Sequence, residues 1–295
     1  MSLHGWIVLD KPLGLSSAQG VAAVKRILRS VGIRPNSIGH GGTLDPLATG
    51  VLPIAIGEAT KLAGRMLDAS KAYAFTVSWG SATSTDDAEG EVVATSDVRP
   101  DVAAIAAVLP HFTGPIDQVP PAYSALKVDG ERAYARARAG ETFTLATRHV
   151  TIHSLELLEA TPDSATFAAD VSKGTYIRSL ARDIAQALGT HGHVTMLRRT
   201  RAGAFRIEDA ITLDKFDALV QTRALEQALL PLMAGLDDIP ALAIDPDEAA
   251  ALRQGRRLSG HPASPGTYLA CLGSVPVALV EIDQSMVRVV RGFNI

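Results

Sequence analysis

The sequence contains a single cysteine, Cys271, among its 295 residues. One cysteine cannot form a disulfide within the chain or build a thiolate zinc site, so neither can stabilise this fold. No uninterrupted apolar run approaches the roughly 18 residues that a membrane-spanning helix needs. The apolar start of the chain has no basic leader and is cut by Asp10 and Pro12. We therefore expect no secretory signal and a cytoplasmic protein.

Several common ligand-binding and hydrolase motifs are also missing. Residues 39–44 faintly resemble a dinucleotide-binding loop, but Leu44 takes the place of the last glycine. No glycine-rich turn is followed by a P-loop lysine, and there is no GxSxG nucleophile elbow. His191 and His193 have no further ligands at metal-binding spacing, so we interpret them as structural or solvent-facing. The sequence thus offers no support for a nucleotide cofactor, a serine hydrolase or a metal site.

The composition predicts a folded chain of two domains. Hydrophobic residues make up 47% and charged residues 20%, which excludes general disorder, and the length suits two domains. Strand patterns mix irregularly with helix patterns, and some strands form hairpins, which indicates an α+β fold. We place the boundary near Pro231–Pro240, between a domain of residues 1–235 and a small strand-rich domain of residues 240–295.

Local patterns predict the individual elements. Ser16 and Gln19 fit a capping box for a helix that ends at Gly32. Residues 35–53 are dense in glycine and proline, so we expect a loop there. Alternation places Tyr73 on the same strand face as Phe75, so Tyr73 taken alone is predicted to be a core aromatic. Further strands are expected near residues 6–9, 72–79, 91–95, 150–158, 165–171, 267–272, 275–282 and 286–290, and further helices over 102–109, 177–188 and from 245 onward.

The net charge of −3 conceals an uneven distribution. Residues 173–207 carry seven basic residues against one acidic residue, whereas residues 208–248 carry ten acidic against two basic residues. The basic stretch fits a face that binds a polyanion, or a solvated surface helix with scattered arginines. Charge alone does not choose between the two.

Asp45 is the most informative single residue. It lies in the glycine-rich stretch His40–Gly50, where a carboxylate can be presented to a ligand with little steric cover. However, an aspartate followed by a proline is also a common turn former. Both interpretations stay open when Asp45 is considered alone.

Six segments, taken together, resemble the motifs of the TruB family of bacterial tRNA pseudouridine synthases. They occur in the family's order and span about residues 5–215. The segments are LDKPxGxSS from Leu9, GHGGTLDPLATGVL from Gly39, KAY from Lys71, PAYSALK from Pro121, SKGTYIR from Ser172 and HVxxLRR from His193.

The resemblance implies a catalytic centre of three residues. Asp45 would be the nucleophile, and the Arg178 guanidinium would favour its ionised form and fix its orientation. Tyr73 would stack on the uracil and assist removal of the carbon-bound proton, which reverses its interpretation as a core aromatic. Whether Asp45 attacks the ribose carbon or the pyrimidine ring stays open.

The resemblance also implies how RNA is bound. Tyr176 and Leu197 would wall the uracil pocket, and His40 would contact the remodelled loop. Lys11 would support the active site, although a solvated loop lysine is an equally simple interpretation. The candidates for phosphate contacts are Lys127, Lys173, Arg198 and Arg199. Residues 124–148 would form an insertion that clasps the RNA loop.

The implied activity is conversion of uridine to pseudouridine at position 55, in the T-loop of the tRNA T-arm, after the base is flipped out. The implied fold has a mixed, mainly antiparallel central sheet flanked by helices, followed by a PUA-like domain. We expect a monomer that needs no cofactor and no metal. Two alternatives stay open: a tRNA-folding protein in which catalysis is secondary, and a glycosidase, although glycosidases usually need paired acids.

Overall fold

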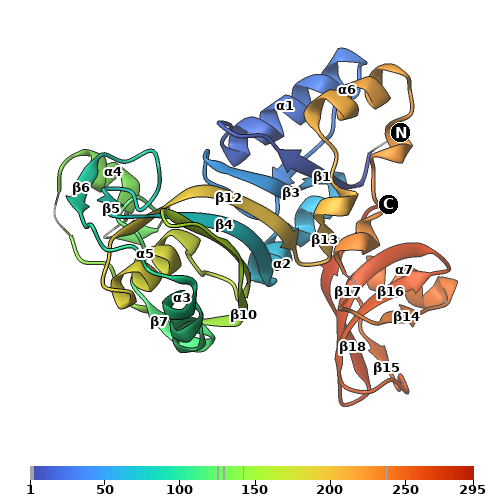
Figure 1. Ribbon diagram of the computed structural model, residues 1–295. Helices are drawn as coiled ribbons and strands as arrows, with labels where there is room; N and C mark the ends of the chain where they lie inside the picture. The colour runs from blue at the N-terminus through green and yellow to red at the C-terminus, as the bar shows by residue number, and fades with distance from the viewer. Residues whose placement is uncertain (1–2, 125, 129, 142, 237) are drawn as a thin grey trace.

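A computed structural model describes residues 3–124, 126–128, 130–141, 143–236 and 238–295. Its main element is a nine-stranded sheet (Figure 1). The strands are β1 (Gly5–Lys11), β2 (Ile38–His40), β3 (Ala48–Ile56), β4 (Lys71–Trp79), β7 (Gly114–Gln118), β10 (Arg148–Ala160), β11 (Ser164–Val171), β12 (Gly192–Ala202) and β13 (Phe205–Arg206). Their order is β1-β3-β12-β4-β11-β10-β7, with β2 beside β3 and β13 beside β12. Strands β3 and β12 are parallel and the other pairs are antiparallel.

Helices flank this sheet, except α7, which packs on the C-terminal sheet described below. The α-helices are α1 (Ser17–Ser30), α2 (Ala63–Asp68), α3 (Val102–Val108), α4 (Ala133–Arg138), α5 (Ile177–Ala187), α6 (Leu213–Gln221) and α7 (Pro246–Arg253). Short 3₁₀ turns are η1 (Gly57–Leu62), η2 (Leu109–Phe112), η3 (Ile207–Asp209), η4 (Leu225–Gln227) and η5 (Leu232–Gly235). Helix α1 has the predicted capping box at Ser16 and Gln19. It contacts α6, and the two lie side by side in Figure 1, while α5 packs on β12 and β4.

Two short hairpins lie outside the main sheet. They pair β5 (Ser81–Thr83) with β6 (Val92–Thr95), and β8 (Lys127–Val128) with β9 (Glu131–Arg132). The segment near residues 91–95 is a strand, as predicted. Its partner is β5 rather than β4, because β4 ends before Gly80. The φ of Gly80 is +94°, in the left-handed region, so the strand cannot continue straight through it.

The predicted loop over residues 35–53 is wrong in part, because β2 lies within it and β3 begins at Ala48 and is almost wholly buried. A strand covered on both faces has a continuous apolar run instead of an alternating pattern. Gly50 adds to the loop-like appearance, but it is needed where β3 meets β12. With φ +98°, an added Cβ would lie 2.2 Å from the carbonyl oxygen of Arg199. The surface-helix interpretation of the basic stretch is also wrong in part, since residues 192–202 form β12.

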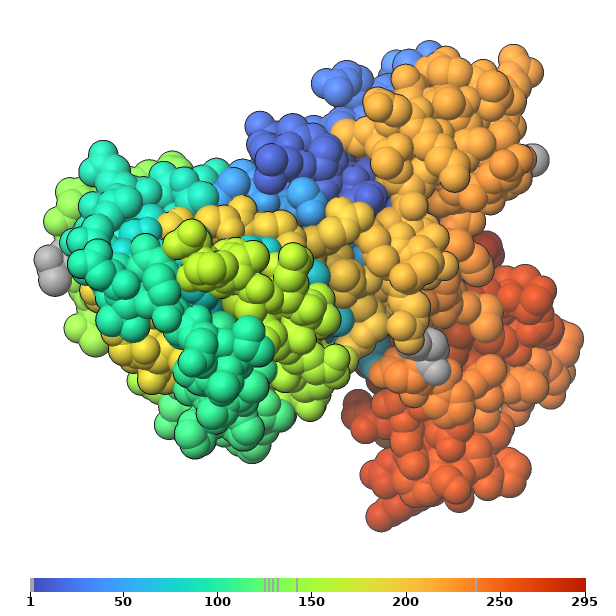
Figure 2. Space-filling view, in the orientation of Figure 1, coloured from blue at the N-terminus to red at the C-terminus, as the bar shows by residue number. Residues whose placement is uncertain are grey.

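The C-terminal residues form a second sheet, seen as a separate lobe in Figure 2. Its strands are β14 (Ala241–Ala243), β15 (Leu258–Ser259), β16 (Gly266–Leu272), β17 (Val275–Asp283) and β18 (Met286–Gly292), in the order β14-β16-β17-β18-β15. One apolar cluster joins the two sheets, since Trp6 of β1 belongs to the same cluster as Leu269 and Phe293. The α+β class with a β-rich C-terminal domain is confirmed. No helix in the described part of the chain has the length and apolarity to cross a membrane.

Candidate active site

A cavity of about 330 Å³ lies beside the start of α5. Five of the seven predicted catalytic and substrate-binding residues line it, although they come from four separate regions of the sequence: Asp45, Tyr73, Tyr176, Arg178 and Leu197. Its volume is at the small end of the range for small-ligand sites, about 300–1,000 Å³. The cavity therefore suits one small group rather than an extended ligand.

The loop that carries Asp45 is held by hydrogen bonds on both sides. The Ser17 hydroxyl of α1 receives a hydrogen bond from the Leu44 N–H at 2.7 Å and donates one to the Leu44 carbonyl at 3.1 Å. The Ala48 N–H donates to the Asp45 carbonyl at 3.0 Å. The Asp45 side chain remains 41% exposed. Its backbone is thus fixed while its carboxylate stays accessible.

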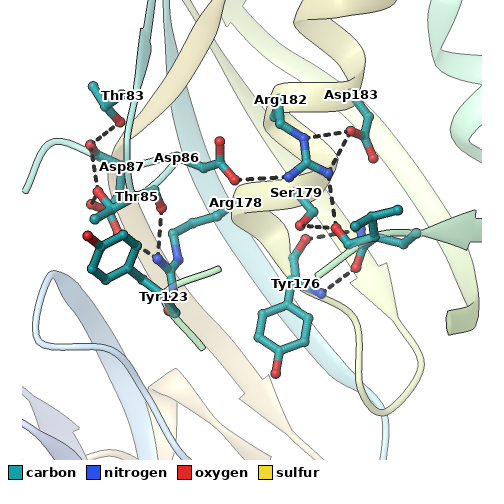
Figure 3. Close-up of polar contacts among 12 residues, drawn as sticks. Thr83, Thr85, Asp86, Asp87, Tyr123, Tyr176, Arg178, Ser179, Arg182 and Asp183 are labelled. Atoms are coloured by element: carbon teal, nitrogen blue, oxygen red, sulfur yellow. Dashed lines mark hydrogen bonds and ion pairs between the residues drawn. The ribbon is translucent and has the colours of Figure 1, made fainter. Parts of the chain in front are cut away.

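Arg178 connects Asp45 to the interior. The Arg178 side chain is 7% exposed, and its guanidinium lies 3.0 Å from the Asp45 carboxylate and 3.1 Å from that of Asp87. It also donates to the Thr85 carbonyl at 2.8 Å and the Tyr123 carbonyl at 2.9 Å (Figure 3). Charge-assisted bonds to several fixed acceptors define the plane of a guanidinium. Arg178 is therefore oriented before any ligand arrives.

The walls of the cavity combine aromatic and aliphatic groups. Tyr73 lies half-buried on β4, and the register pairs Phe75 of β4 with Leu197 of β12. Tyr176 precedes α5; its N–H donates to the Gln118 side chain at 2.8 Å, and the Gln118 amide donates to its carbonyl at 3.1 Å. Burial raises the pKa of the Tyr176 phenol. Such a pocket can stack and enclose a planar base.

Lys11 and His40 lie outside the cavity lining. Lys11 is fully buried, and its ammonium donates to the carbonyls of Pro12, Leu15 and Pro46 at 2.5–3.4 Å. The interpretation as a solvated loop lysine is therefore wrong. Burial lowers the Lys11 pKa to about 8, although the Asp45 charge opposes that shift. Burial and the nearby Arg199 charge lower the pKa of His40.

Family models match most of the chain. The model described as TruB family pseudouridylate synthase (N terminal domain) matches residues 25–177, and that described as tRNA pseudouridylate synthase B C-terminal domain matches residues 178–238. The chain belongs to the TruB family of pseudouridylate synthases. The resemblance seen in the six sequence motifs is thus confirmed, and with it the prediction that the protein is an enzyme of this family.

Relatives of the TruB family match almost the whole chain. The tRNA pseudouridine synthase B of Novosphingobium aromaticivorans is 64% identical, over 99% of this chain and 98% of that protein. That of Zymomonas mobilis is 56% identical, over 99% and 97%. Among solved structures, a chain of a Cbf5-Nop10-Gar1 complex is 29% identical with a TM-score of 0.75, over 98% of this chain and 85% of that one. A chain of an H/ACA RNP bound to a substrate RNA containing 2'-deoxyuridine is 26% identical with the same TM-score, over 99% and 85%.

The predicted phosphate contacts of this TruB family chain need correction at Arg199. Its side chain is 1% exposed and donates to the carbonyls of Val51, Thr43 and Gly42 at 2.7, 3.2 and 3.5 Å. Buried carbonyls need donors, and Arg199 supplies them to Val51 of β3 and to Gly42 and Thr43 of the loop that precedes Asp45. Arg199 is therefore a support for that loop, not a surface cation.

The other three candidates differ in accessibility. Arg198 makes an ion pair with Asp10 at 2.8 Å. Lys173 is paired with Asp68 at 2.9 Å, and both side chains are largely exposed. Lys127 lies in β8, and its side chain falls outside the part of the chain that the structure describes.

Asp87 is the main site residue that the sequence did not reveal. Its side chain is 6% exposed; besides Arg178, its carboxylate receives hydrogen bonds from the Thr85 hydroxyl at 2.5 Å and the Glu89 N–H at 3.0 Å. In the sequence it belongs to an acidic turn between two strands. The available signal was two adjacent aspartates in a tight turn, but nothing local indicates an arginine 91 residues further along.

Proposed function

We propose that this protein converts uridine 55 in the T-loop of tRNA to pseudouridine, with Asp45 as the nucleophile. The observation that carries the proposal is the Asp45 carboxylate, which lies at the cavity wall 3.0 Å from the buried Arg178 guanidinium. The names of the relatives, tRNA pseudouridine synthase B, supply the RNA class.

The reaction is an isomerisation, so its atoms balance without a second substrate. The bond between ribose C1' and uracil N1 breaks, the base turns, and a bond forms between C1' and C5. The C5 proton is lost and N1 ends protonated. Asp45 can form its covalent adduct at C1' or on the pyrimidine ring, and either adduct is resolved when the new glycosidic bond is complete.

The surrounding residues support this chemistry. Tyr73 and Leu197 enclose the base while it turns, and the Tyr73 hydroxyl takes part in moving the C5 proton. Flipping a nucleotide out of a folded loop costs a few kcal/mol, and stacking on an aromatic side chain returns about 1–3 kcal/mol per base. A walled cavity beside the nucleophile therefore offsets much of the cost of extruding the uridine.

We further propose that one protein molecule binds the T-arm of one tRNA in the cytoplasm. Residues 1–235 carry the chemistry, and residues 124–148 form an insertion over the bound loop. Ser124 and Leu126 support this assignment, because they line the cavity from the start of that segment. Residues 240–295, as a PUA-like domain, extend the RNA contact.

The decisive experiment uses an unmodified tRNA transcript with position-resolved detection of pseudouridine. We expect the wild type to modify position 55, and Asp45→Asn to bind the same tRNA with similar affinity but form no pseudouridine. Substantial turnover by Asp45→Asn would refute the nucleophile, and modification at another position would refute the substrate. If the wild type accelerates tRNA folding but forms no pseudouridine, the folding alternative replaces the proposal.

A further inference from the structure

A second arginine lies one helical turn beyond Arg178 on α5. Arg182 lies 3.0 Å from the carboxylate of Asp86, donates to the Val119 carbonyl at 3.0 Å, and pairs with Asp183 at 2.9 Å. Residues four apart on a helix share a face. Both arginines therefore lie on one face of α5, and Figure 3 shows the contact of Arg178 with Thr85 and that of Arg182 with Asp86.

The two arginines repeat one arrangement. Each joins the acidic turn, defined as residues 83–90, to the segment of residues 119–123. Arg178 holds the turn through Thr85 and Asp87 and the segment through the Tyr123 carbonyl. Arg182 holds the turn through Asp86 and the segment through the Val119 carbonyl. Both loops are thus fixed from α5 at two successive points.

The acidic turn depends on contacts from outside itself. Asp86 has a φ of +58°, in the left-handed region that is costly for a residue with a side chain, although aspartate tolerates it better than most. The Val194 N–H of β12 donates to the Asp86 carbonyl at 3.1 Å. The Asp86 carboxylate, in turn, is held by the ion pair with Arg182. Loss of that ion pair would release one of the turn's external contacts.

A shift of this turn would reach the reaction centre directly. Asp86 stands between Thr85 and Asp87, whose carbonyl and carboxylate hold one side of the Arg178 guanidinium. The other side of that guanidinium faces Asp45. Arg182 does not line the cavity, so it can influence the reaction through this chain of contacts but not by touching the base.

We propose that Arg182 is a positioning residue, whose ion pair with Asp86 holds the acidic turn so that Arg178 keeps its orientation toward Asp45. This inference deepens the proposed function and rests on it. It predicts an effect on the chemical step and not on tRNA affinity, because Arg182 acts through Arg178 and does not line the cavity.

The test compares three single variants and one double variant in single-turnover pseudouridine formation at saturating enzyme. Arg182→Gln removes the charge, and Asp86→Asn removes the partner while keeping a residue that tolerates the left-handed conformation. Asp183→Asn is the matched control, since Asp183 pairs with the same arginine but lies outside the turn. Affinity for the same tRNA and the thermal unfolding midpoint are measured in parallel.

We expect Arg182→Gln and Asp86→Asn each to lower the rate constant about tenfold. This is less than the roughly 100-fold cost of a 1 Å misplacement, because Arg178 keeps its own contacts with Asp45 and two carbonyls. Their dissociation constants for tRNA should stay within twofold of the wild type, and Asp183→Asn should be near the wild type in both. The double variant, Arg182→Gln with Asp86→Asn, should be no slower than the slower of these two single variants, since both changes remove the same Arg182–Asp86 ion pair.

Three outcomes would overturn the inference. They are a wild-type rate in Arg182→Gln, multiplicative effects in the double variant, and a rate loss that follows the unfolded fraction in thermal scans. If Arg182→Gln fails to fold, Asp86→Asn decides the question by the same criteria. A wild type without any pseudouridine formation would refute the proposed function and this inference with it, whereas wild-type turnover with an unaffected Arg182→Gln would refute the inference alone.

Discussion

Asp87→Asn is the sharpest probe of how Arg178 is held. The substitution keeps the side-chain shape, so one oxygen can still receive the hydrogen bonds from the Thr85 hydroxyl and the Glu89 N–H. The other oxygen, 3.1 Å from Arg178, becomes an NH₂ group. Two donors then face each other where an ion pair stood, in a place where both side chains are at most 7% exposed.

The size of the effect follows from what Arg178 retains. A hydrogen bond to a charged group contributes about 1.5–3 kcal/mol, whereas a buried charge left without a partner costs about 3–5 kcal/mol. Arg178 keeps Asp45 and two carbonyls, so the lower range applies. We expect the free energy of unfolding to fall by about 2 kcal/mol. If the same loss also misorients Asp45 in the transition state, the rate constant falls about 30-fold.

Urea unfolding and single-turnover pseudouridine formation measure the two quantities. Asp163→Asn is the control, since Asp163 also pairs with an arginine, Arg99, at 3.0 Å but is 80% exposed. Exposed pairs contribute about 0–1 kcal/mol, so this control should be nearly silent in both assays. If Asp87→Asn is no more harmful than Asp163→Asn, the role assigned to the buried pair is refuted. A stability loss with an unchanged rate would show that Asp45 and the carbonyls suffice to orient Arg178.

Two further predictions concern pH and backbone geometry. Burial lowers the pKa of Lys71 to about 8, below its value in the unfolded chain. Above pH 8 the unfolded chain therefore binds more protons than the folded protein, so the free energy of unfolding should rise between pH 8 and 9. Lys71→Met should reduce that slope by up to about 1.4 kcal/mol per pH unit; equal slopes in urea unfolding would contradict the assignment. Gly50→Ala should cost more than about 3 kcal/mol or prevent folding, because its Cβ would lie 2.2 Å from the Arg199 carbonyl oxygen, whereas Gly39→Ala, with no atom within 4 Å, should be tolerated. Circular dichroism and soluble yield distinguish the two variants, and a well-folded Gly50→Ala would refute the close-approach argument.

Local patterns predicted much of the fold. The capping box at Ser16 and Gln19 and the alternating strand that carries Tyr73 were both visible, because each depends on residues a few positions apart. Strand β3 was partly read as a loop, because Gly50 and Pro53 are residues that usually interrupt strands. They are accommodated here by the neighbouring strands, which the sequence pattern around them does not specify.

The candidate site was predictable only as a set of motifs. The motif resemblance singled out Asp45 and Arg178, but spacing within the chain contains no information about the distance between them. The roles of Asp87 and Arg182 could not be predicted for the same reason, since their partners lie 91 and 96 residues away along the chain. Such pairs arise when the sheet brings β12 and α5 against the turn after β5. No periodic pattern in the sequence predicts that contact.

The basic stretch, residues 173–207, shows why the formal charge of a sequence segment does not predict the charge available on the protein surface. Among the described residues, its cations at 173, 178, 182, 198 and 201 all have carboxylate partners, so most of its charge is neutralised by carboxylates from other parts of the chain.

These pairs are not equivalent toward RNA. Lys173 and Asp68 are 64% and 69% exposed, and such a pair contributes about 0–1 kcal/mol, so a phosphate can replace the carboxylate at small cost. Arg178 and Asp87 are buried, and separating them would leave charges without water or partner. Exposure, and not membership of the basic stretch, therefore decides which cations can hold the RNA backbone.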